Sequence, residues 1–289
     1  MKPLVSICCI TYNHGNYIRR CIEGFLLQKT SFPIEILIFD DASTDNTQSV
    51  IQEYSSKYSN IVTFLQTENQ WQHKKYGLLD WLFPNAKGEY IAICEGDDYW
   101  SDENKLQKQV DFLETHSNFI ITCTNAYYIE ENKGYLIDKN AVLVDKSRCT
   151  GEIQLNQQLF ENKIMTLTAV FRNVFKKEIP AEWFNGVKYG DWAMFIYLMQ
   201  YGKIMYFNDI TAVYRKHSGG SFSLRSEIKQ LKDYILTGEI IRKKVSAEWS
   251  QVMIVGQKER LKKLLIVCLK NKDFKTFFSV LFKFRKLLF

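Results

Sequence analysis

The sequence predicts an α/β protein with a mainly parallel sheet, helices on both faces of that sheet and a helical C-terminal extension. Two observations lead to this fold class. Short apolar runs alternate with segments whose apolar residues recur at helical spacing, which is typical of parallel strands joined by helices. Polar residues also follow several of the apolar runs directly, as they do where the strands of an open α/β sheet end.

The first hundred residues contain four predicted strands, at 4–11, 34–39, 61–65 and 90–94. Helical spacing follows the first two of them, and Asp45 with Gln48 forms a plausible capping pair for the second helix. Residues 76–83 are a predicted third helix. Repetition of this strand-and-helix unit favours parallel pairing.

Three carboxylates crowd the end of the fourth predicted strand. Glu95, Asp97 and Asp98 follow the apolar run 90–94 directly. Like charges this close repel one another unless a cation or strong donors compensate for them, and hard oxygen ligands suit Mg²⁺ or Mn²⁺. An acidic surface turn is the simpler alternative, but the position at a strand end favours a metal site.

Two further polar loops are expected at the same edge of the sheet. Thr11, Tyr12 and Asn13 follow the first strand, and Asp40 and Asp41 follow the second. An aromatic face and several carboxylates at one edge indicate a nucleotide site. Packing would explain Tyr12 alone, and a helix-capping turn would explain Asp41 alone. The sequence contains no dinucleotide-binding or P-loop glycine motif.

Composition places the chain among ordinary globular proteins with a basic bias. It has 289 residues, 46% of them hydrophobic, and a formal net charge of +6. The seven cysteines have no regular spacing, so we expect reduced thiols and a cytoplasmic location. We expect no targeting segment and no membrane span. Any association with the cell membrane would then be peripheral, at its inner face.

Four ordered motifs resemble those of family 2 glycosyltransferases, which have the GT-A fold and use nucleotide-sugar donors. They are VSICCITYN, FDDASTDNT and GEYIAICEGDDYW, followed downstream by KYGDW at 188–192, and YRKHSGGSFS from Tyr214 is similar to a motif that closes many bacterial members. The resemblance covers about residues 4–222. It implies a glycosyltransferase domain at 1–222, with a nucleotide-binding half at 1–115 and an acceptor-binding half at 116–222, and a helical extension at 223–289. Glu95 replaces the first aspartate of the usual DxD motif.

The resemblance also implies a role for individual residues. Tyr12 and Asp41 would hold the base, expected to be uracil, and Asp97 would ligate Mn²⁺ or Mg²⁺ with Asp98 beside it. Asp191 would be the general base, although a lone GDW at the start of a helix is more often only a cap. The residues implied for each function are as follows: for the nucleotide Thr11, Tyr12, Asn13, Asp40, Asp41, Glu95 and Asp97; for the metal Asp97, Asp98 and His217; for the acceptor Trp100 and Trp192.

The implied reaction is an inverting, metal-dependent transfer of a hexose from a UDP-sugar to a hydroxyl group. The acceptor would be a glycan or lipid-linked glycan in cell-surface polysaccharide synthesis. A non-catalytic relative that binds nucleotide-sugars or acts as a membrane scaffold is the main alternative. A sugar-phosphate nucleotidyltransferase is a weaker one, because TYNHGNY lacks the glycine-rich basic loop that such enzymes need. The motifs do not identify the sugar or the acceptor.

The C-terminal region has helical spacing at 221–245, 252–269 and 274–289. Residues 256–289 contain ten lysines or arginines and two acids, Glu259 and Asp273. The last segment interleaves phenylalanine and leucine with these cations and reads as a basic amphipathic helix. Such a helix either lies on an anionic membrane surface or packs on its own domain. Nucleic acid is not an expected partner, because no recognised binding module accompanies the charge.

Overall fold

The computed structural model describes residues 2–130, 142–143, 145, 147–176, 178–220 and 225–288. The chain forms two compact units, which are described separately. Unit 1 contains Met1–Glu152, Ile164–Ile179 and Tyr201–Gly219, and unit 2 contains Ile153–Lys163, Pro180–Gln200 and Gly220–Phe289. The last boundary between the two units, between Gly219 and Gly220, lies close to the domain boundary predicted after residue 222. However, two earlier segments, one of which carries Asp191, group with the C-terminal helices.

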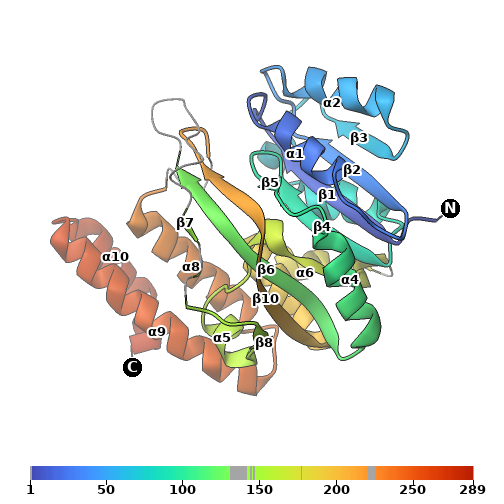
Figure 1. Ribbon diagram of the computed structural model, residues 1–289. Helices are drawn as coiled ribbons and strands as arrows, with labels where there is room; N and C mark the ends of the chain where they lie inside the picture. Colours follow the sequence, from blue (N-terminus) through green and yellow to red (C-terminus); the bar gives the residue numbers. More distant parts are fainter. Residues whose placement is uncertain are drawn as a thin grey trace. The chain divides into compact units, whose positions relative to one another are not determined.

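A ten-stranded mixed sheet forms the centre of unit 1, as far as the structure describes it (Figure 1). The main path of the sheet has the order β3-β2-β1-β4-β9-β6-β10-β5, with β7 beside β6 and β8 beside β10. The strands are β1 Val5–Thr11, β2 Ile34–Asp40, β3 Ile61–Leu65, β4 Tyr90–Glu95, β5 Tyr99–Trp100, β6 Phe119–Glu130, β7 Val142–Leu143, β8 Gly151–Ile153, β9 Val170–Arg172 and β10 Lys203–Lys216.

The first four strands pair in parallel, as the sequence predicted. The apolar runs of β1, β2 and β4 are buried on both faces because helices cover the sheet on each side, whereas β3 at the edge of the sheet is partly exposed. Further along the sheet, β9 runs antiparallel to both β4 and β6, and β5 runs antiparallel to β10. The sheet is therefore parallel in its first half and mixed in its second, which the alternating pattern of the first hundred residues did not reveal.

The helices of unit 1 follow the predicted apolar spacing. The first, α1, buries Ile18, Cys21, Ile22 and Phe25 along one face. The remaining helical segments include a π-helix over part of the predicted helix 76–83. Their bounds are α1 Ile18–Leu26, α2 Thr47–Lys57, η1 Trp71–His73, the π-helix η2 Gly77–Leu82, α3 Phe83–Asn85, α4 Lys105–Thr115, η4 Thr166–Thr168, η5 Val174–Lys176 and η6 Met199–Tyr201, of which η6 begins in unit 2.

The capping pair predicted for α2 is wrong. Asp45 does accept a hydrogen bond from the backbone N–H of Thr47 at 2.9 Å. Gln48, however, points away from the helix start and donates to Asp40 and to the carbonyl of Gln66, at 2.6 and 2.9 Å. The two side chains therefore join the loop after β2 to neighbouring segments instead of capping each other.

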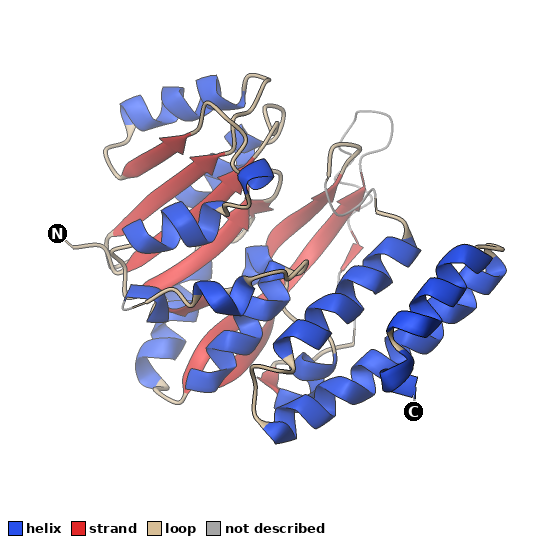
Figure 2. Ribbon diagram, turned by 180° about the vertical axis from the view of Figure 1, so that it is seen from behind, coloured by secondary structure: helices blue, strands red, loops and turns tan. Residues whose placement is uncertain are grey.

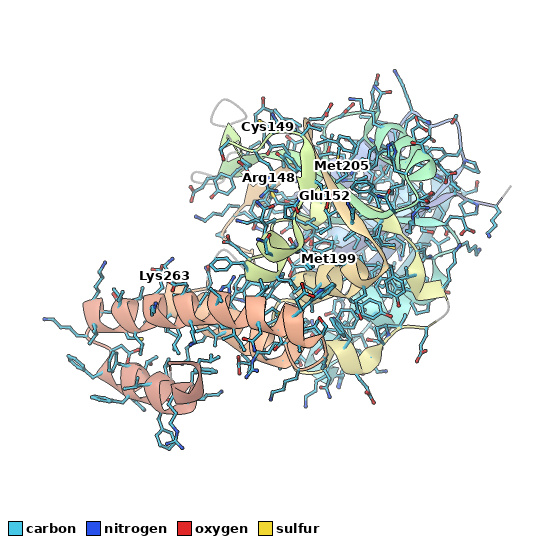
Figure 3. The ribbon with its side chains drawn as sticks, turned by 90° about the horizontal axis from the view of Figure 1, so that it is seen from below. Arg148, Cys149, Glu152, Met199, Met205 and Lys263 are labelled. Carbon is cyan, nitrogen blue, oxygen red and sulfur yellow. The ribbon has the colours of Figure 1, made fainter. Side chains whose placement is uncertain are left out.

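Unit 2 consists of helices. Serine side chains cap α8 and α9, and Lys263, labelled in Figure 3, joins α9 to Glu227 of α8 by an ion pair of 2.9 Å. No helix in the described part of the chain is both long and apolar enough to cross a bilayer. The helices are α5 Leu155–Phe160, α6 Ala181–Phe184, α7 Gly190–Leu198, α8 Glu227–Ile241, α9 Ala247–Lys270, α10 Phe274–Lys283 and α11 Arg285–Leu288.

Two of the C-terminal predictions need adjustment. The helix expected at 221–245 is α8, and residues 221–224 of that range lie outside the described residues. The single helix expected at 274–289 is interrupted at Phe284, which ends α10 before α11 begins.

Candidate active site

The carboxyl ends of β1, β2 and β4 lie side by side at one edge of the sheet in unit 1. In the parallel register Thr11 lies opposite Asp40, and Ile10 lies opposite Glu95. The loops that leave these strands therefore start next to one another, which is the position where open α/β sheets bind ligands.

Asn13 connects the loops after β1 and β2. Its backbone N–H donates to Ser43 Oγ, and its side-chain oxygen accepts from the backbone N–H of Thr44, both at 2.8 Å. Asn13 and Ala42 have left-handed backbone conformations, with φ of 55° and 61°. Residues other than glycine adopt this region rarely, and the hydrogen bonds between the loops stabilise it here. Asn13 thus shapes this edge through its contacts with the protein.

Asp40, predicted to contact the nucleotide, is fully buried. Its carboxylate accepts hydrogen bonds from the backbone N–H of Ser43 at 2.9 Å and from Gln48 at 2.6 Å, and Ser43 Oγ also donates to it. The carboxylate is thus enclosed and paired with residues 43 and 48, and the position near base and ribose expected for Asp40 stays a prediction.

Asp41, by contrast, is partly exposed and joins β2 to the segment that follows β3. It accepts from the backbone N–H groups of Gln70 at 2.6 Å and Trp71 at 3.3 Å. Tyr12 nearby along the edge has 46% of its surface exposed, so its ring is accessible. Thr11 is buried, and a Cβ on Gly96 would lie 2.7 Å from its side chain. The glycine among the acids is thus required by protein packing.

Three potential metal ligands meet beside this edge. His14, Asp97 and His217 each offer one ligand atom, and these atoms all lie within 4.8 Å of one another. Asp97 Oδ2 is 3.1 Å from His217 Nε2 and 3.6 Å from His14 Nε2. The sequence predicted Asp97 and His217 but missed His14. His14 could have been identified from its position in the loop after β1, one residue beyond Asn13, because imidazole is a common metal ligand.

The pKa shifts of His14 and Asp97 favour the forms that bind metals. Burial lowers the pKa of His14 below its ordinary value, although the charge of Asp97 acts in the opposite direction. Burial would raise the pKa of Asp97, but the hydrogen bond from His217 and the charges of both histidines outweigh it and lower that pKa. A neutral imidazole and an ionised carboxylate are the forms in which these side chains bind metals.

Asp98 does not belong to the cluster. It is buried, and its Oδ1 accepts from the backbone N–H of Arg215 at 2.8 Å. Burial, together with the charges of Asp97 and Glu95, raises the pKa of Asp98 well above its ordinary value. This carboxyl group ties the turn after β4 to β10, and the metal-ligand role implied for Asp98 stays a prediction. Glu95 stays partly exposed at the strand end.

Asp191 lies in unit 2, in the first turn of α7. The N-cap position is occupied by Tyr189, so Asp191 is not the helix cap. Asn162 donates from Nδ2 to Asp191 Oδ2 at 2.8 Å, and the side chain remains partly exposed. Burial raises the pKa of Asp191 above its ordinary value, while the backbone N–H of Trp192 and the Asn162 amide act in the opposite direction. Such a carboxylate is a better proton acceptor than an ordinary aspartate.

The two tryptophans predicted to contact the acceptor are both enclosed. Trp192 is fully buried and donates from its indole nitrogen to the carbonyl of Gln158 at 2.8 Å. Trp100 is 3% exposed and donates to the carbonyl of Leu167 at 2.9 Å. Neither ring is exposed in this structure, and the acceptor contacts implied for the two tryptophans stay predictions. Both indoles fix the loops that accept their hydrogen bonds.

Side chains of α8 and α9 contact the residues next to Asp191, which no pattern in the sequence had indicated. Tyr234 of α8 lies with its ring 4.9 Å from that of Trp192, and its hydroxyl accepts from the backbone N–H of Asn162 at 3.3 Å. The guanidinium of Arg260, on α9, lies 4.7 Å from the Tyr234 ring and donates to the carbonyl of Phe160. The C-terminal helices therefore support the segment that holds Asn162.

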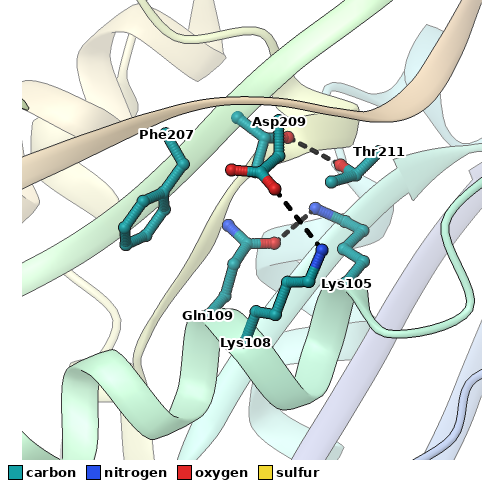
Figure 4. A pocket seen from close by; sticks show the side chains of 7 residues that line it. Lys105, Lys108, Gln109, Phe207, Asp209 and Thr211 are labelled. Atoms are coloured by element: carbon teal, nitrogen blue, oxygen red, sulfur yellow. Dashed lines mark hydrogen bonds and ion pairs between the residues drawn. The ribbon is translucent and has the colours of Figure 1, made fainter. Parts of the chain in front are cut away.

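A separate cavity of about 240 Å³ lies in unit 1 between α4, β6 and β10 (Figure 4). Lys105 and Gln109 are buried in its wall, and Lys105 Nζ donates to Gln109 Oε1 at 2.6 Å and to the carbonyl of Thr168 at 2.9 Å. Lys108 forms an ion pair with Asp209 beside them. None of the predicted site residues lines this cavity.

Several relatives with related sequences carry glycosyltransferase names. The profile of "Glycosyl transferase family 2" matches residues 6–179. The uncharacterized protein Rv1520 of Mycobacterium tuberculosis is 34% identical over 218 residues, which are 75% of this chain and 60% of the relative. The Escherichia coli protein WfaP, named UDP-Glc:alpha-D-GlcNAc-diphosphoundecaprenol beta-1,3-glucosyltransferase, is 30% identical over 75% of this chain and 78% of its own length. The chain thus spans less than two-thirds of its mycobacterial relative.

Solved structures share the fold at low sequence identity. Staphylococcus aureus TarS, in complex with UDP-GlcNAc, has a TM-score of 0.58 and 17% identity and aligns over 99% of this chain and 92% of its own. A mannosyltransferase from Pyrobaculum calidifontis, in complex with GDP-Man and Mn²⁺, has a TM-score of 0.62 and 14% identity, covering 93% and 76%. These similarities confirm the predicted GT-A fold. With the profile match over more than half of its length, the chain belongs to glycosyl transferase family 2.

Proposed function

We propose that the protein is an inverting, divalent-metal-dependent hexosyltransferase that moves a sugar from a UDP-sugar to a hydroxyl group. The observation that carries this proposal is the cluster of His14, Asp97 and His217 at the carboxyl edge of the sheet, beside the exposed ring of Tyr12. Ligands of this kind next to an accessible aromatic face suit a nucleotide diphosphate held through a metal ion.

The residues present fit a divalent cation and favour Mn²⁺ over Mg²⁺. Two imidazole nitrogens and one carboxylate form a mixed nitrogen and oxygen set, whereas Mg²⁺ prefers oxygen ligands throughout. The Pyrobaculum calidifontis mannosyltransferase, which shares the fold, is in complex with Mn²⁺, and this supports the same choice. When bound, the ion would offset the charge that develops on the departing nucleoside diphosphate.

Uridine is the proposed base of the donor. WfaP is named for UDP-Glc, and TarS is described with UDP-GlcNAc, while the mannosyltransferase is described with GDP-Man. The fold therefore admits different bases. In this chain Tyr12 would supply the stacking face, and Asp41, held by two backbone N–H groups, would face the imide N–H of uracil.

Asp191 is the proposed general base. It would accept the proton of the acceptor hydroxyl while that oxygen forms a bond to the anomeric carbon of the sugar. The bond from that carbon to the diphosphate oxygen breaks in the same step, and its electron pair leaves with the nucleoside diphosphate. A single displacement of this kind inverts the anomeric configuration. The raised pKa of Asp191 and its hydrogen bond from Asn162 support this role.

The proposed acceptor is a glycan or lipid-linked glycan of cell-surface polysaccharide synthesis, at the cytoplasmic face of the membrane. The name of WfaP, which specifies an undecaprenol-linked sugar, supports this choice. The basic C-terminal segment supports an anionic membrane surface as a further partner. The alternative, a non-catalytic nucleotide-sugar-binding or scaffold protein, would not require a carboxylate positioned like that of Asp191.

A panel of nucleotide-sugars tests the function directly. Purified protein is incubated with each donor and Mn²⁺, and both hydrolysis and transfer to a lipid-linked sugar acceptor are measured, together with the anomeric configuration of the product. We expect turnover with a UDP-sugar, loss of turnover with a chelator, and loss in Asp97→Ala. Asp80→Ala, a carboxylate change outside the cluster, is the matched control. Nucleotide-sugar binding without turnover under all conditions would favour the non-catalytic alternative.

A further inference from the structure

The C-terminal helices of unit 2 bury one side of α10 and leave the other side exposed. On the buried side, Val280 and Phe284 pack with Leu261, Leu264 and Cys268 of α9 in a common apolar cluster. Figures 1 and 2 show α9 beside both α8 and α10. Some of the apolar residues expected to form a membrane-binding helix thus belong to the protein core.

Three phenylalanines remain on the other side of α10. Phe274, Phe278 and Phe282 are 55%, 64% and 72% exposed, and we call them the aromatic stripe. They are spaced four residues apart, so they follow one another along one face of the helix. Phe282 has the largest exposed fraction of the large hydrophobic residues in the described structure. Exposed apolar surface of this continuity is typical of an interaction site.

Cations accompany the aromatic stripe. Lys275, Lys283 and Arg285 are all exposed, and the guanidinium of Arg285 lies 4.9 Å from the centre of the Phe282 ring. The nearest acid in the sequence, Asp273, accepts a hydrogen bond from the backbone N–H of Thr276 at 3.0 Å and so caps α10. The exposed part of this segment therefore combines large aromatic rings with neighbouring positive charges.

We propose that α10 lies flat in the surface of a membrane that contains anionic phospholipid, with the aromatic stripe inserted among the acyl chains and the three cations at the phosphate groups. Exposed rings in a row along α10, flanked by Lys275 and Lys283 of the same helix and by Arg285 of α11, suit an interfacial position. Pairing with a second copy of this chain across a two-fold axis would bring two positive faces together, which costs free energy. The proposal rests on the membrane partner of the proposed function, but on none of its catalytic residues.

Vesicle co-sedimentation with the full chain tests this proposal. The vesicles contain phosphatidylcholine with or without phosphatidylglycerol. We expect wild type to bind the anionic vesicles about tenfold or more tightly than the neutral ones, and Phe274→Ser/Phe278→Ser/Phe282→Ser to lose most of this binding. Because all three side chains are exposed, the variant should fold, which circular dichroism checks.

Matched variants separate the stripe from general hydrophobicity and charge. Leu27→Ser/Trp71→Ser removes exposed apolar groups of unit 1, and Lys29→Glu/Lys57→Glu/Lys203→Glu reverses exposed cations there. The Leu27→Ser/Trp71→Ser variant should bind anionic vesicles as wild type does. The Lys29→Glu/Lys57→Glu/Lys203→Glu variant should bind them more tightly than Lys275→Glu/Lys283→Glu/Arg285→Glu does. Transfer to a water-soluble acceptor should be unchanged in the stripe variant, so a failed catalytic proposal would not affect this test.

Two outcomes would overturn the proposal. One is undiminished binding of the stripe variant to anionic vesicles. The other is that light scattering shows a dimer for wild type and a monomer for the stripe variant, while neither protein binds vesicles. That result would assign the stripe to contact with a second copy of the chain.

Discussion

His217 Nε2 lies 3.1 Å from Asp97 Oδ2, although 120 positions separate the two residues in the chain. Asp97 follows β4 and His217 follows β10, and Tyr17 packs against the His217 ring at a centroid distance of 4.4 Å. With His14 from the loop after β1, these residues form a cluster to which three separate segments contribute. Each should therefore matter for metal affinity.

Substitution of either histidine tests the cluster. We expect His14→Ala and His217→Ala each to weaken Mn²⁺ binding at least about tenfold, because each removes a candidate ligand. His73→Ala, which changes an exposed histidine, is the control. Titration calorimetry with Mn²⁺ and UDP measures the effect. Unchanged affinity in His14→Ala would remove that residue from the metal site while leaving Asp97 and His217 to be judged separately.

Asp191→Asn should lower turnover by about 10² to 10⁴ because an amide keeps the shape of the carboxylate but cannot accept a proton. UDP affinity should stay close to that of wild type. Asp209→Asn, whose carboxylate pairs with Lys108, is the matched control and should retain activity. A residual rate in Asp191→Asn within a few-fold of wild type would assign the general base to another residue.

The pH dependence of turnover should reveal the contact between Asn162 and Asp191. The amide of Asn162 donates to the ionised carboxylate and so lowers its pKa. Asn162→Leu should therefore raise the pKa of Asp191 and shift the acid side of the kcat profile to higher pH. Gln107→Leu, a change to an exposed amide of α4, should leave the profile in place. A uniformly reduced profile with no shift would mean that Asn162 has only a structural role.

Tyr12→Ala should weaken UDP binding about tenfold through loss of the aromatic face. Tyr58→Ala, a change to another exposed tyrosine, should leave UDP affinity unaltered. Competition among UDP, GDP and ADP for the donor site measures both the loss and the base preference. Equal displacement by all three nucleotides would contradict recognition of uracil.

Buried Lys105 should make stability depend on pH. Burial lowers its pKa to about 7, so between that value and its ordinary pKa the unfolded chain binds more protons than the folded one. Stability should therefore rise with pH above about 7, by roughly 1 kcal/mol per pH unit from this group. Lys105→Met should be more stable near neutral pH and should lack this contribution. Urea unfolding of both proteins at two pH values measures the difference, and parallel pH dependences would contradict the assignment.

The sequence alone determined the parallel half of the sheet and the edge at which its loops meet. The apolar runs at 4–11, 34–39, 61–65 and 90–94 predicted strands, and parallel pairing then brings Thr11, Asp40 and Glu95 to one edge. The same patterns predicted α1 and the position of Asp191 at the start of α7, because periodicity and local motifs act over a few residues.

Only the tertiary structure decided what each polar side chain contacts. Asp40, Asp98, Trp100 and Trp192 stand in motifs that resemble ligand-binding segments, yet each is enclosed and paired within the protein. His14 lies beside Asp97 and His217 because β1 and β4 pair at one register and β10 ends nearby, and Asn162 contacts Asp191 although 29 positions separate them in the chain. Burial and partner choice depend on contacts between distant segments, and periodicity along the chain contains no information about those contacts.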